Sequence, residues 1–286
     1  MVQQGDTIKV TNGNWFEDVK TVRDGTASNR ITIKGNGGTA NRENVVVRGA
    51  GTSTRVFEIR HDYYVLKDFT IDGKAKGKPV NPEEYNDSYR SKGGDAFKDA
   101  YRDKLLYISS NGEREPTIRD GDYRSAVDGV VVKNMFLKNT GGECIRLRDF
   151  VTNADINRNE IMTCGLYDYE FGDGGKNGEG ILKNFSDEPD QCRGNVVKNN
   201  LIVTNRRGNE GVEVKDGSVG NVFKNNEINI QLDVYSNGDN TILKTTSSAT
   251  RQARVYAWAA LRSMGSPTVS TVRFSAITWK SAYRME

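Results

Sequence analysis

The residues best suited to chemistry lie in the segment 205–216. Six charged side chains occur there: Arg206, Arg207, Glu210, Glu213, Lys215 and Asp216. A lysine whose pKa is lowered towards the working pH can accept a proton as a general base. Carboxylates are the hard oxygen ligands that Ca²⁺ prefers, and guanidinium groups bind anions in a forked geometry. The segment therefore predicts a general base (Lys215), a calcium site (Glu210, Glu213 and Asp216) and two anion-binding residues (Arg206 and Arg207).

These side chains need a strand to position them. Residues 211–214 alternate small or apolar with polar residues between turn-forming residues, which is typical of a half-buried strand. Because side chains alternate across a strand, Val212 and Val214 should point inward, and Glu213 and Lys215 outward. One such strand cannot bury its own apolar face, so we expect related strands elsewhere in the chain.

Related strands occur upstream. Each begins with an acid, a small residue and a branched apolar residue: Glu143-Cys144-Ile145, Glu179-Gly180-Ile181 and Glu210-Gly211-Val212. Aligning them places Arg146 in the column of Glu213 and Arg148 in the column of Lys215, about 10 Å away at the usual strand spacing. Asn184 should lie between Arg148 and Lys215. One outer face would then present Arg146, Arg148, Asn184, Glu213 and Lys215.

A second repeat ends in asparagine before an apolar pair. It recurs with Asn134, Asn159, Asn200 and Asn226, and the spacing of roughly 20–40 residues is typical of a solenoid. Stacked coils would bring these four asparagines into one column, in which the side-chain amides bond one another as a ladder. The fold class predicted is therefore all-β, a parallel β-helix, built as one elongated domain.

The repeat sets the boundaries within that domain. It spans residues 1–245 and is broken at 74–124, which we interpret as an inserted loop region flanking a groove, with a short helix at Asp95–Leu106. Residues 246–286 should form a C-terminal cap or tail, with a helix at Ala249–Met264 that covers the open end. An insertion at 74–124 without any role in binding fits the sequence equally well.

Composition excludes several classes of function. The net charge is only +3, from 41 basic and 38 acidic residues without a basic run, so we expect no nucleic-acid partner. The single histidine, His61, has no serine or cysteine motif around it, which argues against a catalytic triad. No apolar segment approaches the length of a membrane span. We expect a secreted monomer, with sequons at Asn86 and Asn184 consistent with secretion.

The three cysteines, Cys144, Cys164 and Cys192, form no CxxC pair, so a zinc knuckle is not expected. Cys164 and Cys192 both fall at loop positions and are the pair we expect to form a disulfide. Cys144 lies in a strand and should pack against a neighbouring coil.

Several segments resemble right-handed parallel β-helix proteins of the pectate lyase-like superfamily: Gly5-Asp6-Thr7-Ile8, 29–35, 142–148, 177–181 and 210–218. The resemblance covers about residues 5 to 245. It implies a carbohydrate groove along one sheet, with an acidic, uronate-containing polysaccharide as the substrate. In lyases of this superfamily, calcium or arginine neutralises a uronate carboxylate, and a lysine or arginine takes the C5 proton.

The resemblance assigns roles to the predicted face. Lys215 would be the base and Arg148 would neutralise or steer the carboxylate, while Arg146, Asn184, Arg206 and Arg207 would bind substrate. Two alternatives stay open, because the superfamily is diverse in reaction. A glycoside hydrolase would use paired carboxylates, such as Glu179 with Glu210 or Glu213 with Asp216, at the separations that hydrolysis requires. A non-catalytic β-helix would bind glycan or serve as structure.

Overall fold

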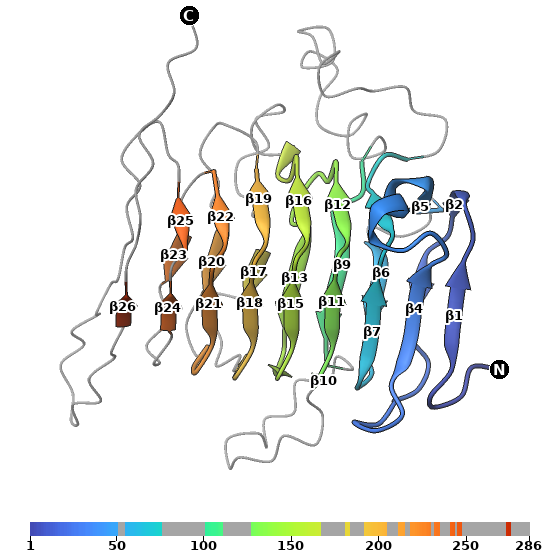
Figure 1. Cartoon of the computed structure of the whole chain (residues 1–286), viewed down its shortest axis with the longest axis horizontal. Helices are drawn as coiled ribbons and strands as arrows, with labels where there is room; N and C mark the ends of the chain where they lie inside the picture. The colour runs from blue at the N-terminus through green and yellow to red at the C-terminus, as the bar shows by residue number, and fades with distance from the viewer. Residues whose placement is uncertain are drawn as a thin grey trace, which may run out of the picture.

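The computed structural model describes residues 1–50, 55–75, 101–110, 127–166, 181–183, 192–204, 211–214, 218–229, 232–234, 241–243, 245–247 and 273–275. Its strands form three long parallel sheets, which we call sheets A, B and C, and one small two-stranded sheet. Figure 1 shows the strands side by side in stacked rows, from β1 near one end to β24 and β26 at the other.

The strands of each sheet are far apart in sequence and adjacent in space. Sheet A contains β1 (Thr7–Val10), β4 (Ile31–Gly35), β7 (Tyr64–Lys67), β11 (Val131–Lys133), β15 (Asp155–Asn157), β18 (Val196–Lys198), β21 (Val222–Lys224), β24 (Thr241–Leu243) and β26 (Arg273–Ser275). Sheet B contains β2 (Gly13–Phe16), β5 (Val45–Arg48), β8 (Thr70–Asp72), β12 (Phe136–Lys138), β16 (Glu160–Met162), β19 (Leu201–Val203), β22 (Glu227–Ile228) and β25 (Thr246–Ser247). Sheet C contains β3 (Val19–Lys20), β6 (Arg55–Ile59), β9 (Lys104–Ser109), β13 (Ile145–Arg148), β17 (Ile181–Lys183), β20 (Val212–Val214) and β23 (Leu232–Val234).

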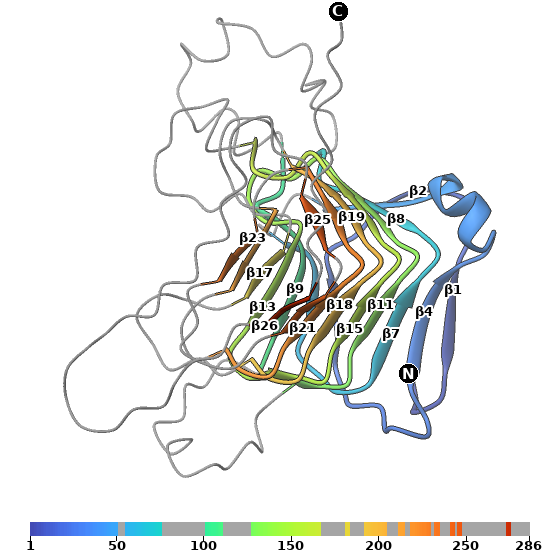
Figure 2. The same ribbon diagram turned by 60° about the vertical axis from the view of Figure 1, so that its left-hand side comes forward.

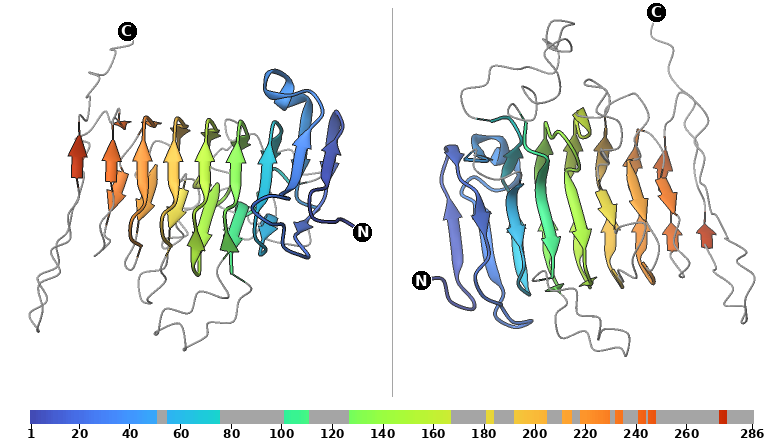
Figure 3. Two further views of the ribbon diagram at one scale, coloured as in Figure 1. Left: turned by 60° about the horizontal axis from the view of Figure 1, so that its bottom comes forward. Right: turned by 180° about the vertical axis from the view of Figure 1, so that it is seen from behind.

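The chain visits the sheets in the order A, B, C in successive coils, as a right-handed parallel β-helix does. The small sheet joins β10 (Val127–Asp128) to β14 (Val151–Thr152), and one 3₁₀ helix, η1 (Thr39–Asn44), precedes β5. Figure 2 shows the sharp corner at which sheets A and B meet, and Figure 3 shows the same row of strands from two further sides.

The core is built from stacked inward-facing side chains. One column in sheet A is entirely apolar and buried: Ile33, Leu66, Val132, Ile156, Val197 and Phe223. A matching column in sheet B is Val47, Ile71, Leu137, Ile161, Ile202 and Ile228. Burial of these side chains is the main favourable term in folding and fixes the register, because a slip by one residue would turn each column outward.

An asparagine ladder lies at the corner between sheets A and B. The Nδ2 of Asn159 donates to Oδ1 of Asn200 at 3.0 Å, and the Nδ2 of Asn200 donates to Oδ1 of Asn226 at 3.0 Å. The prediction for Asn134 was wrong. Asn134 occupies the preceding position with φ of 53°, and Met135 stands in the buried column, its N–H donating to Asn159. Asparagine tolerates this left-handed backbone as well as the ladder position, so sequence alone did not separate the two.

A second asparagine ladder lies at the corner between sheets C and A. The Nδ2 of Asn195 donates to Oδ1 of Asn221 at 3.0 Å and to the main-chain oxygen of Val151 at 2.9 Å. Both asparagines are fully buried. The sequence analysis did not identify this ladder.

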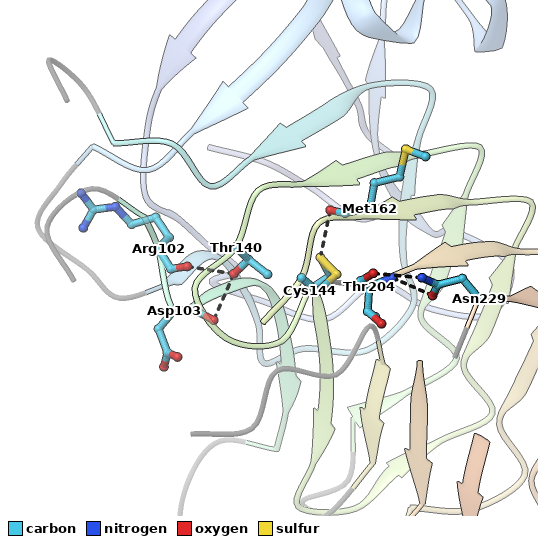
Figure 4. The surroundings of a disulfide bond; sticks show 8 residues. Arg102, Asp103, Thr140, Cys144, Met162, Thr204 and Asn229 are labelled. Carbon is cyan, nitrogen blue, oxygen red and sulfur yellow. Dashed lines mark hydrogen bonds between the residues drawn. A yellow bond between two sulfur atoms is a disulfide. The ribbon is translucent and has the colours of Figure 1, made fainter. Parts of the chain in front are cut away.

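The disulfide prediction was also wrong. Cys144 is bonded to Cys164, with a Cα–Cα distance of 5.7 Å, and Cys192 is a buried free thiol. Figure 4 shows the bond beside Thr140, whose hydroxyl donates to the main-chain oxygens of Arg102 and Asp103. The two bonded cysteines meet at the corner between sheets B and C, whereas Cys192 lies at the corner between sheets C and A.

Two expected features differ from the structure. The described end of the helix expected at Asp95–Leu106 is strand instead, because Lys104–Ser109 is β9 of sheet C within the expected insertion. Beyond residue 245, Thr246–Ser247 and Arg273–Ser275 continue sheets B and A. The helix expected at Ala249–Met264 lies outside the described residues. No helix in the described part of the chain is long and apolar enough to cross a membrane.

Candidate functional site

Three of the predicted site residues, Arg146, Arg148 and Glu213, lie on strands of sheet C. The register aligns one column of residues across the sheet: Glu58, Tyr107, Arg146, Leu182, Glu213 and Asp233. The prediction that Arg146 and Glu213 share a column two strands apart is confirmed. At the usual strand spacing, their backbones are about 10 Å apart.

Four members of this column, those whose burial the structure describes, are covered rather than open to solvent. Glu58, Tyr107, Arg146 and Glu213 are all buried, although the alternation along each strand turns them away from the apolar core. Charged groups without water need partners, because an isolated buried charge is strongly unfavourable. The ion pairs described next supply such partners for Glu58 and Arg146.

Glu143 joins the cations of β9 and β13. Its Oε1 accepts a hydrogen bond from Nη1 of Arg146 at 2.7 Å, and its Oε2 lies 3.0 Å from Nζ of Lys104. Lys104 also pairs with Asp103, at 2.5 Å. Glu143 thus binds two side-chain cations, while Glu179 and Glu210 lie outside the described residues.

Glu58 is the centre of a second ionic cluster on the same face. Its carboxylate lies 2.9 Å from Nη2 of Arg60, 3.5 Å from Nζ of Lys20 and 3.6 Å from Nη1 of Arg55. The guanidinium of Arg55 also stacks over the ring of Tyr107, 3.7 Å from the ring centroid. This cation–π contact links the Glu58 cluster to the next strand of the sheet.

Arg148 lies at the end of β13, paired in register with Ser109. Its Nε lies 3.4 Å from Oδ1 of Asp149, and the Ser109 hydroxyl donates to Oδ2 of Asp149 at 2.8 Å. The Arg148 side chain is 20% exposed, compared with 6% for Arg146. Of the two predicted substrate-contacting arginines that the structure describes, Arg148 is therefore the more accessible.

On this face, the side chains of the cations are more exposed to solvent than the glutamates that they contact. The side chains of Lys20 and Arg60 are 59% and 34% exposed, whereas the Glu58 side chain that they contact is 6% exposed. Lys104 is 14% exposed above Glu143, which is 2% exposed. Glu58 and Glu143 thus hold these cations in place from beneath. The accessible part of the Glu58 cluster is positively charged, whereas in the Glu143 cluster Asp103, at 29%, is more exposed than Lys104.

Most of the other predicted site residues lie outside the described residues: Lys215, Asn184, Arg206, Arg207, Glu210 and Asp216. Glu213 is the one predicted calcium ligand that the structure describes, and the register places Asp233 next to it. Within the described part of the chain, no group of three or more His, Cys, Asp or Glu residues could hold a metal ion.

Sequence analysis missed Glu58, Lys104 and Tyr107. Lys104 and Tyr107 fall in the segment interpreted as an insertion, so their strand was not aligned with the others. The alternation in Leu106-Tyr107-Ile108 was the available signal, because it matches Ile145-Arg146-Leu147 position by position.

A separate row of aspartates follows the corner between sheets C and A. Oδ1 of Asp24 accepts the N–H of Asp62, and Oδ1 of Asp62 accepts the N–H of Asp128. Burial raises the pKa of Asp62. Burial also acts to raise the pKa of Asp128, but hydrogen bonds from Tyr63, Asn153 and Thr152 outweigh it, so its pKa lies below the ordinary value. These carboxylates satisfy the backbone of the turn.

No known sequence family and no curated protein sequence matches the chain. Among solved structures, an alginate lyase from Paenibacillus sp. str. FPU-7 superposes with a TM-score of 0.60 at 17% identity, covering 89% of this chain and 84% of that one. This likeness supports the parallel β-helix fold. Pectin methylesterase PemA from Erwinia chrysanthemi also matches, with a TM-score of 0.42 at 13% identity over 87% of this chain and 81% of that one. At such identities the likeness of this β-helix to either protein concerns the fold alone.

Proposed function

We propose that this β-helix is an enzyme that cleaves an acidic, uronate-containing polysaccharide by β-elimination on the outer face of sheet C. The observation that carries the proposal is the arrangement of charge there. Lys20 and Arg60 are far more accessible than the Glu58 carboxylate beneath them, and Lys104 is more accessible than Glu143. A face that presents cations along neighbouring strands suits a polymer that carries one carboxylate on each sugar. The structural likeness to an alginate lyase is consistent with this substrate class.

The proposed reaction needs three roles. Arg148 neutralises the uronate carboxylate, which makes the C5 proton more acidic. Lys215, as the neutral amine, takes that proton, the electron pair forms the C4–C5 double bond, and the bond from C4 to the glycosidic oxygen breaks. The departing oxygen takes up a proton and becomes the new chain end. Asn184, Arg206 and Arg207 bind the sugars on either side, and Arg146, which is buried and paired with Glu143, contributes positive charge from beneath them.

We also propose that Ca²⁺ assists substrate binding, with Glu210, Glu213 and Asp216 as ligands. The set consists of oxygen donors only, as Ca²⁺ prefers. When bound, the ion would supply positive charge for a uronate carboxylate. Glu213 is on the outer column of sheet C, two strands from Arg146, so the proposed ion and the arginine would belong to one column of the sheet. Raising the Ca²⁺ concentration should raise the melting temperature of wild-type protein, and Glu213→Gln should remove that increase.

The base is tested by a matched pair of substitutions. Lys215→Ala should abolish the rise in ultraviolet absorbance on the polysaccharide that wild-type protein degrades. Lys138→Ala removes a lysine on sheet B, which belongs to neither proposed binding face, and should leave turnover unchanged. Undiminished turnover in Lys215→Ala would show that another group takes the proton. In keeping with its substrate, we propose that the protein acts as a monomer outside the cell.

A further inference from the structure

A row of lysines runs along the outer face of sheet A, away from the site on sheet C. The register places them in one column on successive strands, with one asparagine between: Lys9, Lys34, Lys67, Lys133, Asn157, Lys198 and Lys224. Figures 1 and 2 show these strands, β1, β4, β7, β11, β15, β18 and β21, lying side by side. Over six strand spacings the row is about 29 Å long. We call it the lysine row.

Most of these charges have no acidic partner within the described residues. There, Lys198 alone forms an ion pair, with Asp155 at 2.9 Å. On sheet B, in contrast, Arg48 pairs with Asp72 and Arg42 with Glu160. The chain as a whole carries a net charge of only +3. The lysine row therefore concentrates on one narrow face more positive charge than the whole chain has in excess.

Like charges on neighbouring strands repel one another. At about 5 Å in water, each adjacent pair costs roughly 0.8 kcal/mol before the side chains move apart. A chain of anions laid along the row would replace this repulsion with attraction and release its counterions. The acids nearest to the row offset it only in part. Asp155 pairs with Lys198, and the single carboxylate of Asp68, which accepts hydrogen bonds from Thr39 and Asn134, faces the other five lysines.

The residues beside the lysine row indicate which polyanion fits. On the corner side lie Asp68, Asn134, Arg158, Asn199 and Asn225, and on the other side lie Thr32, Val65, Val131, Asp155, Val196 and Val222. Each of the three asparagine amides donates one N–H to a neighbouring side chain, and its second N–H can bond a hydroxyl group. The outward residues of β4, β7, β11, β15, β18 and β21 include no aromatic side chain, whereas single-stranded nucleic acids are bound by stacking on aromatic rings. The row is straight, and an extended pyranose polymer advances at each ring by a length close to one strand spacing.

We infer that the lysine row is a second, non-catalytic binding site for an extended acidic polysaccharide. One carboxylate-bearing sugar would lie over each strand, with Lys34, Lys67 and Lys133 at the centre of the contact. The site lies on a different sheet from the proposed catalytic residues, so the inference does not depend on the proposed lyase reaction. A chain held there would keep the protein on its polymer while sheet C remains free.

The test is affinity electrophoresis in native gels with and without alginate or pectate. The triple variant Lys34→Gln, Lys67→Gln, Lys133→Gln should bind at least about tenfold more weakly than wild type, because each lysine near an anionic surface contributes roughly fivefold. The mobility of each protein is divided by its own mobility in the gel without polymer, because the variants differ from wild type in net charge. In solution, the affinity of wild type should fall with rising salt, and less steeply for the triple variant.

Lys133→Gln and Lys138→Gln form the matched control. The two lysines belong to one coil, but Lys138 lies on sheet B against the ring of Phe136. Lys133→Gln should weaken retardation and Lys138→Gln should not. The melting temperature of the triple variant should stay at or above that of wild type, since repulsion is removed. Equal retardation of triple variant and wild type would overturn the inference, as would stronger retardation by single-stranded DNA than by either polysaccharide.

Discussion

Glu143→Gln tests the charge arrangement of the candidate site. Glu143 is buried and contacts two cations, with Arg146 Nη1 at 2.7 Å and Lys104 Nζ at 3.0 Å. Removing one partner of a buried ion pair costs about 3–5 kcal/mol, because a charge is left without compensation. Two features reduce this cost here. Glutamine can still accept a hydrogen bond from Arg146, and Lys104 keeps Asp103.

We therefore expect Glu143→Gln to lower the free energy of unfolding by about 2–3 kcal/mol. The control is Glu160→Gln, which breaks the Arg42 pair on sheet B, where the Glu160 side chain is 30% exposed. That pair should contribute less than about 1 kcal/mol. Urea unfolding followed by circular dichroism measures both values. If Glu143→Gln were as stable as Glu160→Gln, the acid would not hold the cations of sheet C, and the account of the site would be refuted.

Two further predictions concern the corners. Asn200→Ala should lower the free energy of unfolding, measured in urea, by about 3 kcal/mol. The N–H and Nδ2 of Asn159 and the main-chain oxygen of Ile156 would each lose a buried partner. The control is Asn199→Gly, at the adjacent exposed position with φ of 56°, which should lower it by less than about 0.5 kcal/mol. An equal loss of stability in the two variants would contradict a stabilising role for the asparagine ladder. Asp128 has a pKa below its unfolded value, so its ionised form stabilises the fold above that unfolded value, and the contribution is lost as pH falls through the folded pKa. Asp128→Asn should accordingly be less stable than wild type at pH 7 and equal to it in strong acid, and a difference that does not change with pH would contradict this assignment.

Much of the fold could be predicted because period-two alternation and corner residues repeat along the chain. The strands that contain Ile156, Val197 and Phe223 share one pattern, so their stacking follows from alignment. The same argument failed by one residue at Asn134, since asparagine favours both positions of that corner. It also failed for Cys144 and Cys164, because which cysteines meet depends on how the chain enters sheet C, which local pattern does not specify.

The sequence predicted which residues of the candidate site share a column, but it did not predict their burial or their ion pairs. Arg146 and Glu213 share a column because their strands begin with the same motif. Their burial, and the ion pair of Arg146 with Glu143, depend on packing that no single strand encodes. The lysine row was missed for another reason. Its members are separated by many residues in the chain, so Lys67 and Lys133 become neighbours only when the coils stack.

The central claim is that the protein cleaves an acidic polysaccharide by β-elimination. The most direct measurement follows ultraviolet absorbance and reducing ends together during incubation with pectate, alginate, glucuronan or chondroitin, with and without Ca²⁺. Each β-elimination creates one unsaturated uronate and one reducing end, so we predict that the two signals rise in equal amounts on at least one substrate. Reducing ends without absorbance would indicate hydrolysis by paired carboxylates, and neither signal on any substrate would indicate a β-helix that binds glycan without cleaving it. Either result would contradict the claim.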